Sequence, residues 1–225
     1  MSERAPLPAG IRLAAGLATA AALVVLFGTT NELAVLMELD HYLALPFDAA
    51  GLEPLPRLFL ELQQTQLRLL GTHRELSVTV LFLLSVATGF VFAAALRFLR
   101  PGRMPLGGLR TLLSRAALAA ALLYTVDGAQ EAAVARKTAV LVTERLPGIL
   151  AAAPAAAKEP ASPEVAAQRE TLDRTLPQLR WMLPLTSVFK TALFALLFAW
   201  LGRYFQAASV QRAVEALDRE LPSEE

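Results

Sequence analysis

The sequence predicts an all-α, polytopic membrane protein with four transmembrane helices that extend into an extracytoplasmic four-helix bundle of two αα-hairpins. The first observation behind this prediction is Leu76–Leu96, a run of 21 residues without a charge. At about 1.5 Å per residue, such a helix crosses the roughly 30 Å of a bilayer's apolar core. The second is a composition of 55% hydrophobic and 18% charged residues, whereas soluble domains carry about a quarter charged residues. The third is a rough internal repeat, in which each half holds a span, an outgoing helix, a proline-rich hinge, a returning helix and another span.

The composition also excludes several kinds of site and partner. The chain has no cysteine, so disulfides, thiolate metal sites and cysteine nucleophiles are ruled out. The formal net charge is +1 and no basic block with interleaved aromatics occurs, so no nucleic-acid partner is expected. Arginine far outnumbers lysine, which is typical of a GC-rich bacterial genome. We therefore expect the protein in a bacterial inner (plasma) membrane.

The first half of the chain, residues 13–96, follows a short cytoplasmic lead at residues 1–12. Its first span is the charge-free run from Leu13 to Asn31. A basic lead and an apolar run also fit a cleaved signal peptide, but no A-x-A-like cleavage site follows Phe27. A retained membrane anchor is therefore the favoured interpretation.

Residues 31–75 form the first outward hairpin. Residues 31–45 keep the helical spacing of leucines, and three prolines with a glycine at 46–56 break the helix. Residues 57–75 resume it, with no breaker before the span that follows. We therefore expect one long helix over residues 57–96 that enters the membrane.

A basic cytoplasmic turn, residues 97–108, separates the two halves. Residues 97–115 hold five arginines and no acid. The third span has the shortest charge-free run, residues 116–126, which cannot cross a bilayer alone. Taking residues 109–130 gives enough length if Arg115 extends back to the basic turn.

The second half, residues 109–202, repeats the order of the first. Its outgoing helix continues to residue 146, an Ala/Pro-rich linker occupies residues 147–163, and a helical stripe returns over residues 164–183. The two hairpins should pack together, because neither can bury its apolar stripe alone. The cytoplasmic tail, residues 203–225, is amphipathic, and it is either a docking helix for a partner or a surface helix under the membrane.

The distribution of charge predicts the orientation. Basic residues gather on the cytoplasmic side, and short loops count most. The basic turn is such a loop, whereas residues 30–75 carry three basic and seven acidic residues. Residues 127–180 carry seven of each over a long segment. We therefore expect both termini and the basic turn in the cytoplasm and both hairpins outside.

Lys190 is the sharpest functional candidate, because a charge inside a span is costly and usually faces protein or water. It lies 13 residues before Arg203, so roughly 20 Å from the cytoplasmic boundary. Asp127 lies near the outer end of the third span, so Lys190 and Asp127 form a candidate intramembrane charge pair. The alternative is that Lys190 extends to the outer headgroups.

Small residues in the second span predict helix packing. Ser85, Gly89 and Ala93 recur at four-residue spacing, and small side chains at this spacing let helices approach closely. Packing inside the chain is the simpler interpretation, and a homodimer contact is the alternative.

No residue pattern predicts catalysis, a cofactor or a metal site. The motifs G-x-S-x-G, P-loop and H-E-x-x-H are absent. His41 and His73 lack a His or Glu partner at i+3 or i+4, and the expected helices separate them by roughly 10 Å in height.

These features indicate a non-enzymatic integral membrane protein, which acts as an interaction, scaffold or sensor/accessory subunit of an inner-membrane assembly. The expected partners are the lipid bilayer and either another protein or a second copy of the chain. The alternative is a transporter or channel component that uses Lys190 and Asp127 in the membrane bundle. Four spans are few for a carrier, so this alternative requires oligomerisation.

Overall fold

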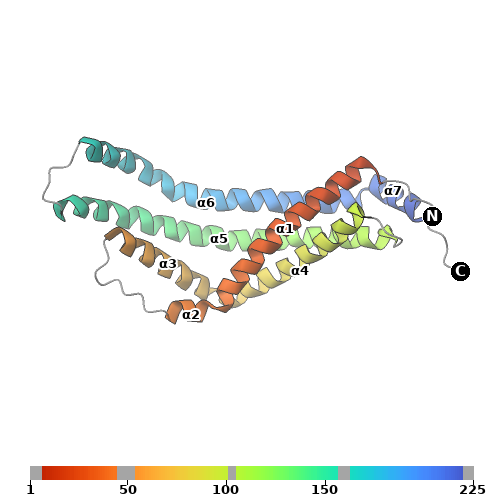
Figure 1. Cartoon of the computed structure of the whole chain (residues 1–225), viewed down its shortest axis with the longest axis horizontal. Helices are drawn as coiled ribbons and strands as arrows, with labels where there is room; N and C mark the ends of the chain where they lie inside the picture. Colours follow the sequence, from red (N-terminus) through yellow and green to blue (C-terminus); the bar gives the residue numbers. More distant parts are fainter. Residues whose placement is uncertain (1–6, 45–53, 101–104, 157–162, 220–225) are drawn as a thin grey trace. The chain divides into compact units, whose positions relative to one another are not determined.

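The computed structural model of the protein describes residues 7–44, 54–100, 105–156 and 163–219. Over these ranges the chain forms seven helices and no strand (Figure 1), which confirms the all-α prediction. The helices are α1 (Ala9–Met37), α2 (Leu39–Ala44), α3 (Pro54–Thr72), α4 (Arg74–Leu99), α5 (Leu106–Ala156), α6 (Pro163–Gln206) and α7 (Ala208–Arg219).

Four of these helices are long and apolar enough to cross a membrane, which fits a multi-pass membrane protein and confirms the expected number of spans. Arg115 lies within α5 and does not interrupt it, so the short charge-free run and its polar flanks form a single helix. The candidate spans are Ala9–Met37, Arg74–Leu99, Leu106–Gly148 and Arg180–Gln206.

Helices α5 and α6 continue well beyond the length that a bilayer requires. α5 has 51 residues and α6 has 44, against about 20 for a membrane span. α5 passes through Pro147 and ends at Ala156, so the expected linker at residues 147–163 begins inside a helix. An interior proline removes one helical hydrogen bond, but the alanines around Pro154 have the highest helix propensity of any residue. Residues 157–162 of the expected linker lie outside the described residues.

The helix expected over residues 57–96 is interrupted once. α3 ends at Thr72 and α4 begins at Arg74, with His73 between them. The Ser77 backbone N–H donates to the His73 carbonyl at 2.9 Å, so helical hydrogen bonding resumes directly after the interruption.

Arg74, the first residue after this interruption, contacts the end of α1. Its guanidinium donates to the Met37 carbonyl at 3.2 Å and to the Asp40 carboxylate at 2.6 Å. Met37 is the last residue of α1, and the final carbonyls of a helix lack partners within the helix and favour a nearby cation. One side chain therefore joins the break between α3 and α4 to the break between α1 and α2.

The chain divides into two compact units. Unit 1 comprises Met1–Ala34, Val78–Asp127 and Thr191–Glu225, and unit 2 comprises Val35–Ser77 and Gly128–Lys190. Unit 1 therefore holds parts of all four candidate spans together with α7.

The core of unit 1 permits close contact between helices because alanines supply much of it. At Gly202 of α6, an added Cβ would lie 2.6 Å from Leu118 Cγ of α5. Ser114 Oγ of α5 donates to the Gly202 carbonyl at 3.0 Å, so the two backbones are held together by a hydrogen bond as well as by packing. Fully enclosed members of this core include Ala15, Ala18, Ala22, Ala117, Ala120, Phe98, Phe198 and Phe205.

Helix α7 packs on unit 1 of its own chain. Its apolar residues Val210, Val214 and Leu217 are buried in the unit 1 core. The Asp218 carboxylate accepts hydrogen bonds from the first backbone N–H groups of α5, those of Leu106 and Gly107, at 2.9 to 3.0 Å, and so caps that helix. The sequence predicted that this amphipathic helix binds a partner or lies on the membrane; its apolar face is instead buried within the chain.

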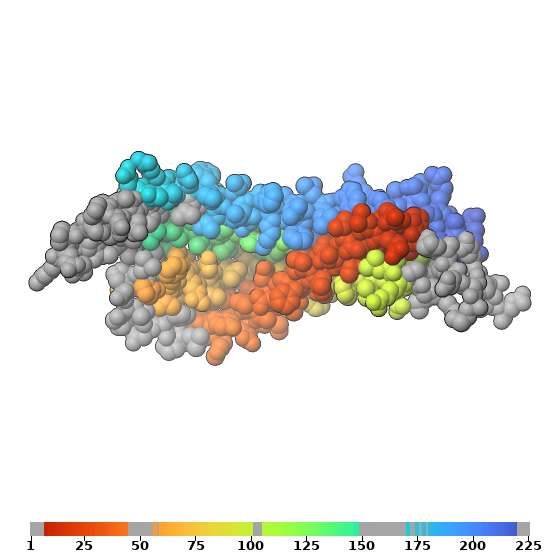
Figure 2. Space-filling view, turned by 45° about the horizontal axis from the view of Figure 1, so that its top comes forward, coloured from red at the N-terminus to blue at the C-terminus, as the bar shows by residue number. Residues whose placement is uncertain are grey.

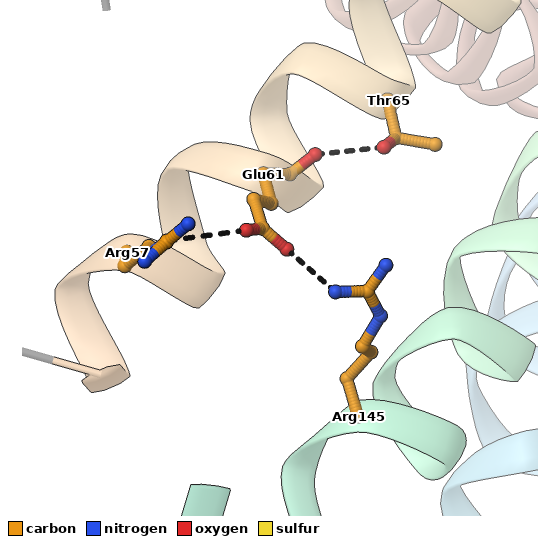
Figure 3. A network of polar contacts seen from close by, with 4 residues as sticks. All are labelled: Arg57, Glu61, Thr65 and Arg145. Carbon is orange, nitrogen blue, oxygen red and sulfur yellow. Dashed lines mark hydrogen bonds and ion pairs between the residues drawn. The ribbon is translucent and has the colours of Figure 1, made fainter. Parts of the chain in front are cut away.

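A polar network joins α3 to α5 within unit 2 (Figure 3). Arg145 Nη1 of α5 lies 3.3 Å from Glu61 Oε2 of α3, and Arg57 Nε lies 3.5 Å from Glu61 Oε1. These side chains are more than one third exposed, so each ion pair contributes at most about 1 kcal/mol. The network therefore contributes little to stability, and its main effect is to set which residues of α3 and α5 contact each other.

Helix α6 is the least buried of the four candidate spans. Only 11% of its apolar stretch is buried, against 44% for α4. Large apolar side chains therefore lie on its outer surface, where Figure 2 shows α6 in blue. The most exposed are Trp181, Phe189 and Leu196.

Candidate functional site

Lys190 forms an ion pair with a residue that the sequence analysis did not consider. Its ammonium Nζ lies 2.9 Å from Glu131 Oε1 and 2.8 Å from Glu131 Oε2. Lys190 belongs to α6 and Glu131 to α5, and both lie in unit 2. The positive charge of Lys190 in α6 is therefore paired with the carboxylate of Glu131 in α5.

This ion pair is only partly shielded from its surroundings. The side chain of Lys190 is 44% exposed and that of Glu131 is 39% exposed. Both residues lie within candidate spans, where an unpaired charge would be expensive to place next to lipid. The pair lowers that cost while leaving both charged groups accessible, so it can serve as a structural contact or as a contact point for an ion.

A second polar contact lies beside the pair. Ser77 Oγ of α4 donates to Gln130 Oε1 of α5 at 2.8 Å, and Ser77 is buried. Gln130 directly precedes Glu131 in the sequence. Side chains from α4 and α6 therefore contact two consecutive residues of α5. We call these four residues the polar layer of unit 2.

The predicted partner Asp127 lies one helical turn before Glu131 on α5. The sequence analysis selected Asp127 because it ends the charge-free run of the third span. The i+4 spacing of the two acids places both on one side of α5. This spacing was the signal in the sequence that could have identified Glu131 as a second candidate partner of Lys190. The pair of Lys190 with Asp127 stays a prediction.

The small-residue stripe of α4 takes little part in packing within unit 1. Ser85 Oγ donates to Thr29 Oγ1 of α1 at 2.9 Å. A Cβ added at Gly89 would meet no atom within 4 Å, and Ala93 is exposed. The packed face of α4 is instead Leu84, Ala87, Thr88, Val91, Ala94, Ala95 and Phe98.

The two histidines show no arrangement for a metal ion. His41 contacts Tyr42 edge to face, with ring centroids 6.1 Å apart. Among the described residues, no group of three histidine, aspartate or glutamate side chains is placed to hold a metal.

The described residues are all-helical, and four of the helices could cross a membrane, which fits a multi-pass membrane protein. No protein-family model matches the chain, and no curated protein or solved structure is detectably similar to it. The function is therefore inferred from the chain's own residues.

Proposed function

We propose that the protein is a non-enzymatic membrane subunit of an inner-membrane assembly, in which unit 1 anchors the chain and unit 2 contacts a protein partner. The observation that carries this proposal is an apolar side chain of unit 2 that lies exposed outside the candidate spans. Phe59 of α3 is 62% exposed, and α3 is not among the helices that could cross a membrane.

An apolar side chain on a helix outside the bilayer is stabilised when another surface covers it, since burial of apolar area is favourable. Leu43 of α2 is also exposed, at 39%, and α2 contacts α3. Exposed apolar groups that cluster on a surface mark interaction sites.

The α3–α5 contact supports a hairpin bundle as the form of unit 2. Glu61 and Arg145 join the first outward hairpin to the second, as expected if the two hairpins pack on each other. We place this bundle on the outer side of the membrane and both termini in the cytoplasm, because the arginine-rich turn at residues 97–108 favours the cytoplasm.

Single-cysteine crosslinking in native membranes tests the proposal. The chain has no cysteine, so Phe59→Cys creates one reactive site on unit 2. The matched control is Leu122→Cys, on an equally exposed apolar position of unit 1. We expect Phe59→Cys to give a defined protein adduct of fixed mass, either with a partner or with a second copy, and Leu122→Cys to give none. Equal adducts at both positions, or no protein adduct at Phe59, would contradict an interaction role for unit 2.

A membrane-impermeant thiol reagent tests the orientation with two further single-cysteine variants. Ala156→Cys on α5 should react in intact cells, whereas Arg219→Cys on α7 should react only after lysis. Reaction of Arg219→Cys in intact cells would reverse the proposed orientation.

The second candidate is a transporter or channel component, and the Lys190–Glu131 pair favours it. A partly exposed ion pair within candidate spans is a feature of ion pathways. Reconstituted liposomes would show an ion flux that Lys190→Met and Glu131→Gln both abolish. Absence of flux in the unmodified protein would remove this candidate.

A further inference from the structure

One end of unit 1 brings together the ends of five helices (Figure 1). The start of α1 meets the end of α6, because a Cβ added at Gly10 would lie 3.1 Å from the Tyr204 hydroxyl. The ends of α4 and α6 meet through the rings of Phe98 and Phe205, whose centroids are 5.3 Å apart. Asp218 of α7 caps the start of α5.

Exposed arginines surround this end, and we call them the arginine collar. They come from α1, from α6, from α7 and from the end of α4. The collar consists of Arg12, Arg97, Arg100, Arg203, Arg212 and Arg219, all of which are exposed.

The described acids near this end, Asp218 and Glu215, both accept hydrogen bonds. The carboxylate of Asp218 accepts the backbone N–H groups of Leu106 and Gly107. Glu215 accepts a hydrogen bond from Gln211 Nε2 at 2.8 Å. The positive charge of the collar therefore exceeds the negative charge that the described residues of this end supply.

The collar lies where the apolar runs of the spans stop. Arg97 directly follows the charge-free run that ends at Leu96, and Arg203 directly follows Gly202 in α6. Arginines at such positions lie at the depth of lipid headgroups. α7 cannot insert its own apolar face into lipid, because Val214 and its neighbours are buried in unit 1.

We propose that the arginine collar binds the phosphate groups of anionic phospholipids in the adjacent leaflet. A guanidinium offers several donors in a planar fork that matches phosphate oxygens. The six arginines are spread over the ends of four helices and do not converge on one point. That arrangement suits several lipid headgroups around the unit better than a single soluble phosphate.

Tryptophan quenching by brominated lipid measures this binding in the full-length protein. Trp200 lies three residues before Arg203 and stacks on Tyr204, with ring centroids 5.4 Å apart. The chain has two tryptophans, so Trp181→Phe leaves Trp200 as the only reporter. The protein in neutral detergent is titrated with phosphatidylglycerol or phosphatidylcholine that carries brominated acyl chains.

We expect phosphatidylglycerol to quench Trp200 at a lower mole fraction than phosphatidylcholine. Each basic residue near an anionic surface contributes roughly fivefold in affinity, so Arg97→Gln, Arg203→Gln and Arg212→Gln together should weaken quenching by about a hundredfold. The matched control is Arg57→Gln, Arg174→Gln and Arg180→Gln in unit 2, which removes the same charge from exposed arginines. That control should change the phosphatidylglycerol affinity by less than about threefold.

Three results would overturn the proposal. Equal quenching by the two lipids would remove any preference for anionic headgroups. If the collar variant and the control variant weakened quenching by phosphatidylglycerol equally, the preference would depend only on the net charge of the protein. Displacement of the lipid by millimolar inorganic phosphate would assign the site to a soluble anion.

Salt dependence tests the unmodified collar if the collar variant does not fold. Between about 0.1 M and 1 M salt the Debye length falls from about 10 Å to about 3 Å. Quenching by phosphatidylglycerol should weaken at least tenfold over this range, and quenching by phosphatidylcholine should not. A salt-independent preference for phosphatidylglycerol would contradict an electrostatic collar.

Discussion

Gly202 on α6 packs directly against α5 in unit 1, and its replacement by alanine should destabilise the protein. The added Cβ would lie 2.6 Å from Leu118 Cγ, 2.8 Å from Leu118 Cδ2 and 3.1 Å from the Ser114 carbonyl oxygen. Leu118 can rotate away at a cost, but the Ser114 oxygen belongs to the backbone of α5. The two helices must therefore separate, which strains the hydrogen bond from Ser114 Oγ to the Gly202 carbonyl.

The expected loss combines two opposing contributions. Overpacking of a closed core costs about 1–3 kcal/mol. Replacing a helical glycine by alanine returns about 0.5–1 kcal/mol. The net loss for Gly202→Ala in the free energy of unfolding should therefore reach up to about 2.5 kcal/mol.

Gly89→Ala is the matched control, since it makes the same change within α4. A Cβ at Gly89 would meet nothing within 4 Å, so only the favourable contribution of about 0.5–1 kcal/mol remains. Unfolding of both variants by SDS titration in one mixed detergent measures the difference. If both variants shift in the same direction by the same amount, the close contact between α5 and α6 does not exist as described.

Three further predictions concern single polar contacts. Lys190→Met and Glu131→Gln should each destabilise the protein, and the double variant should show a coupling energy of about 0.5–1 kcal/mol in SDS unfolding; strict additivity would contradict the ion pair. Asp218→Ala should cost about 0.5–2 kcal/mol, while Asp218→Asn should retain most of the stability because asparagine caps helices nearly as well; equal losses would show that capping is not the role of the side chain. Thr138 Oγ1 is buried without a hydrogen-bond partner among the described residues, so Thr138→Val should raise the unfolding free energy by about 1 kcal/mol, and a loss would indicate a partner for that hydroxyl.

The spans could be predicted because hydropathy and length are local properties of the sequence. The third span shows the limit of that reasoning, since its charge-free run covers only residues 116–126 and the polar flanks had to be included. α5 includes them without a break. The end of α5 was not predicted, because Pro147 and Pro154 were expected to break the helix and α5 instead includes both.

The remaining differences arise from contacts between residues far apart in sequence. Arg74, next to the interruption at His73, contacts the Met37 carbonyl 37 residues away, and no local pattern in the sequence indicates that contact. Glu131 meets Lys190 across 59 residues. The amphipathic pattern of α7 showed that its apolar face must be covered, but it carried no information on whether a partner, a lipid or the same chain covers it.

The cap on α5 has a consequence for the order in which the protein is made. The backbone N–H groups of Leu106 and Gly107 are capped by the carboxylate of Asp218, which lies 112 and 111 residues later in the chain. Asp218 is synthesised after all four candidate spans, so the start of α5 stays uncapped until synthesis of the chain is nearly finished. Closure of this end of unit 1 is thus a late event, and a chain truncated before α7 would lack the cap on the first turn of α5 together with Arg212 and Arg219.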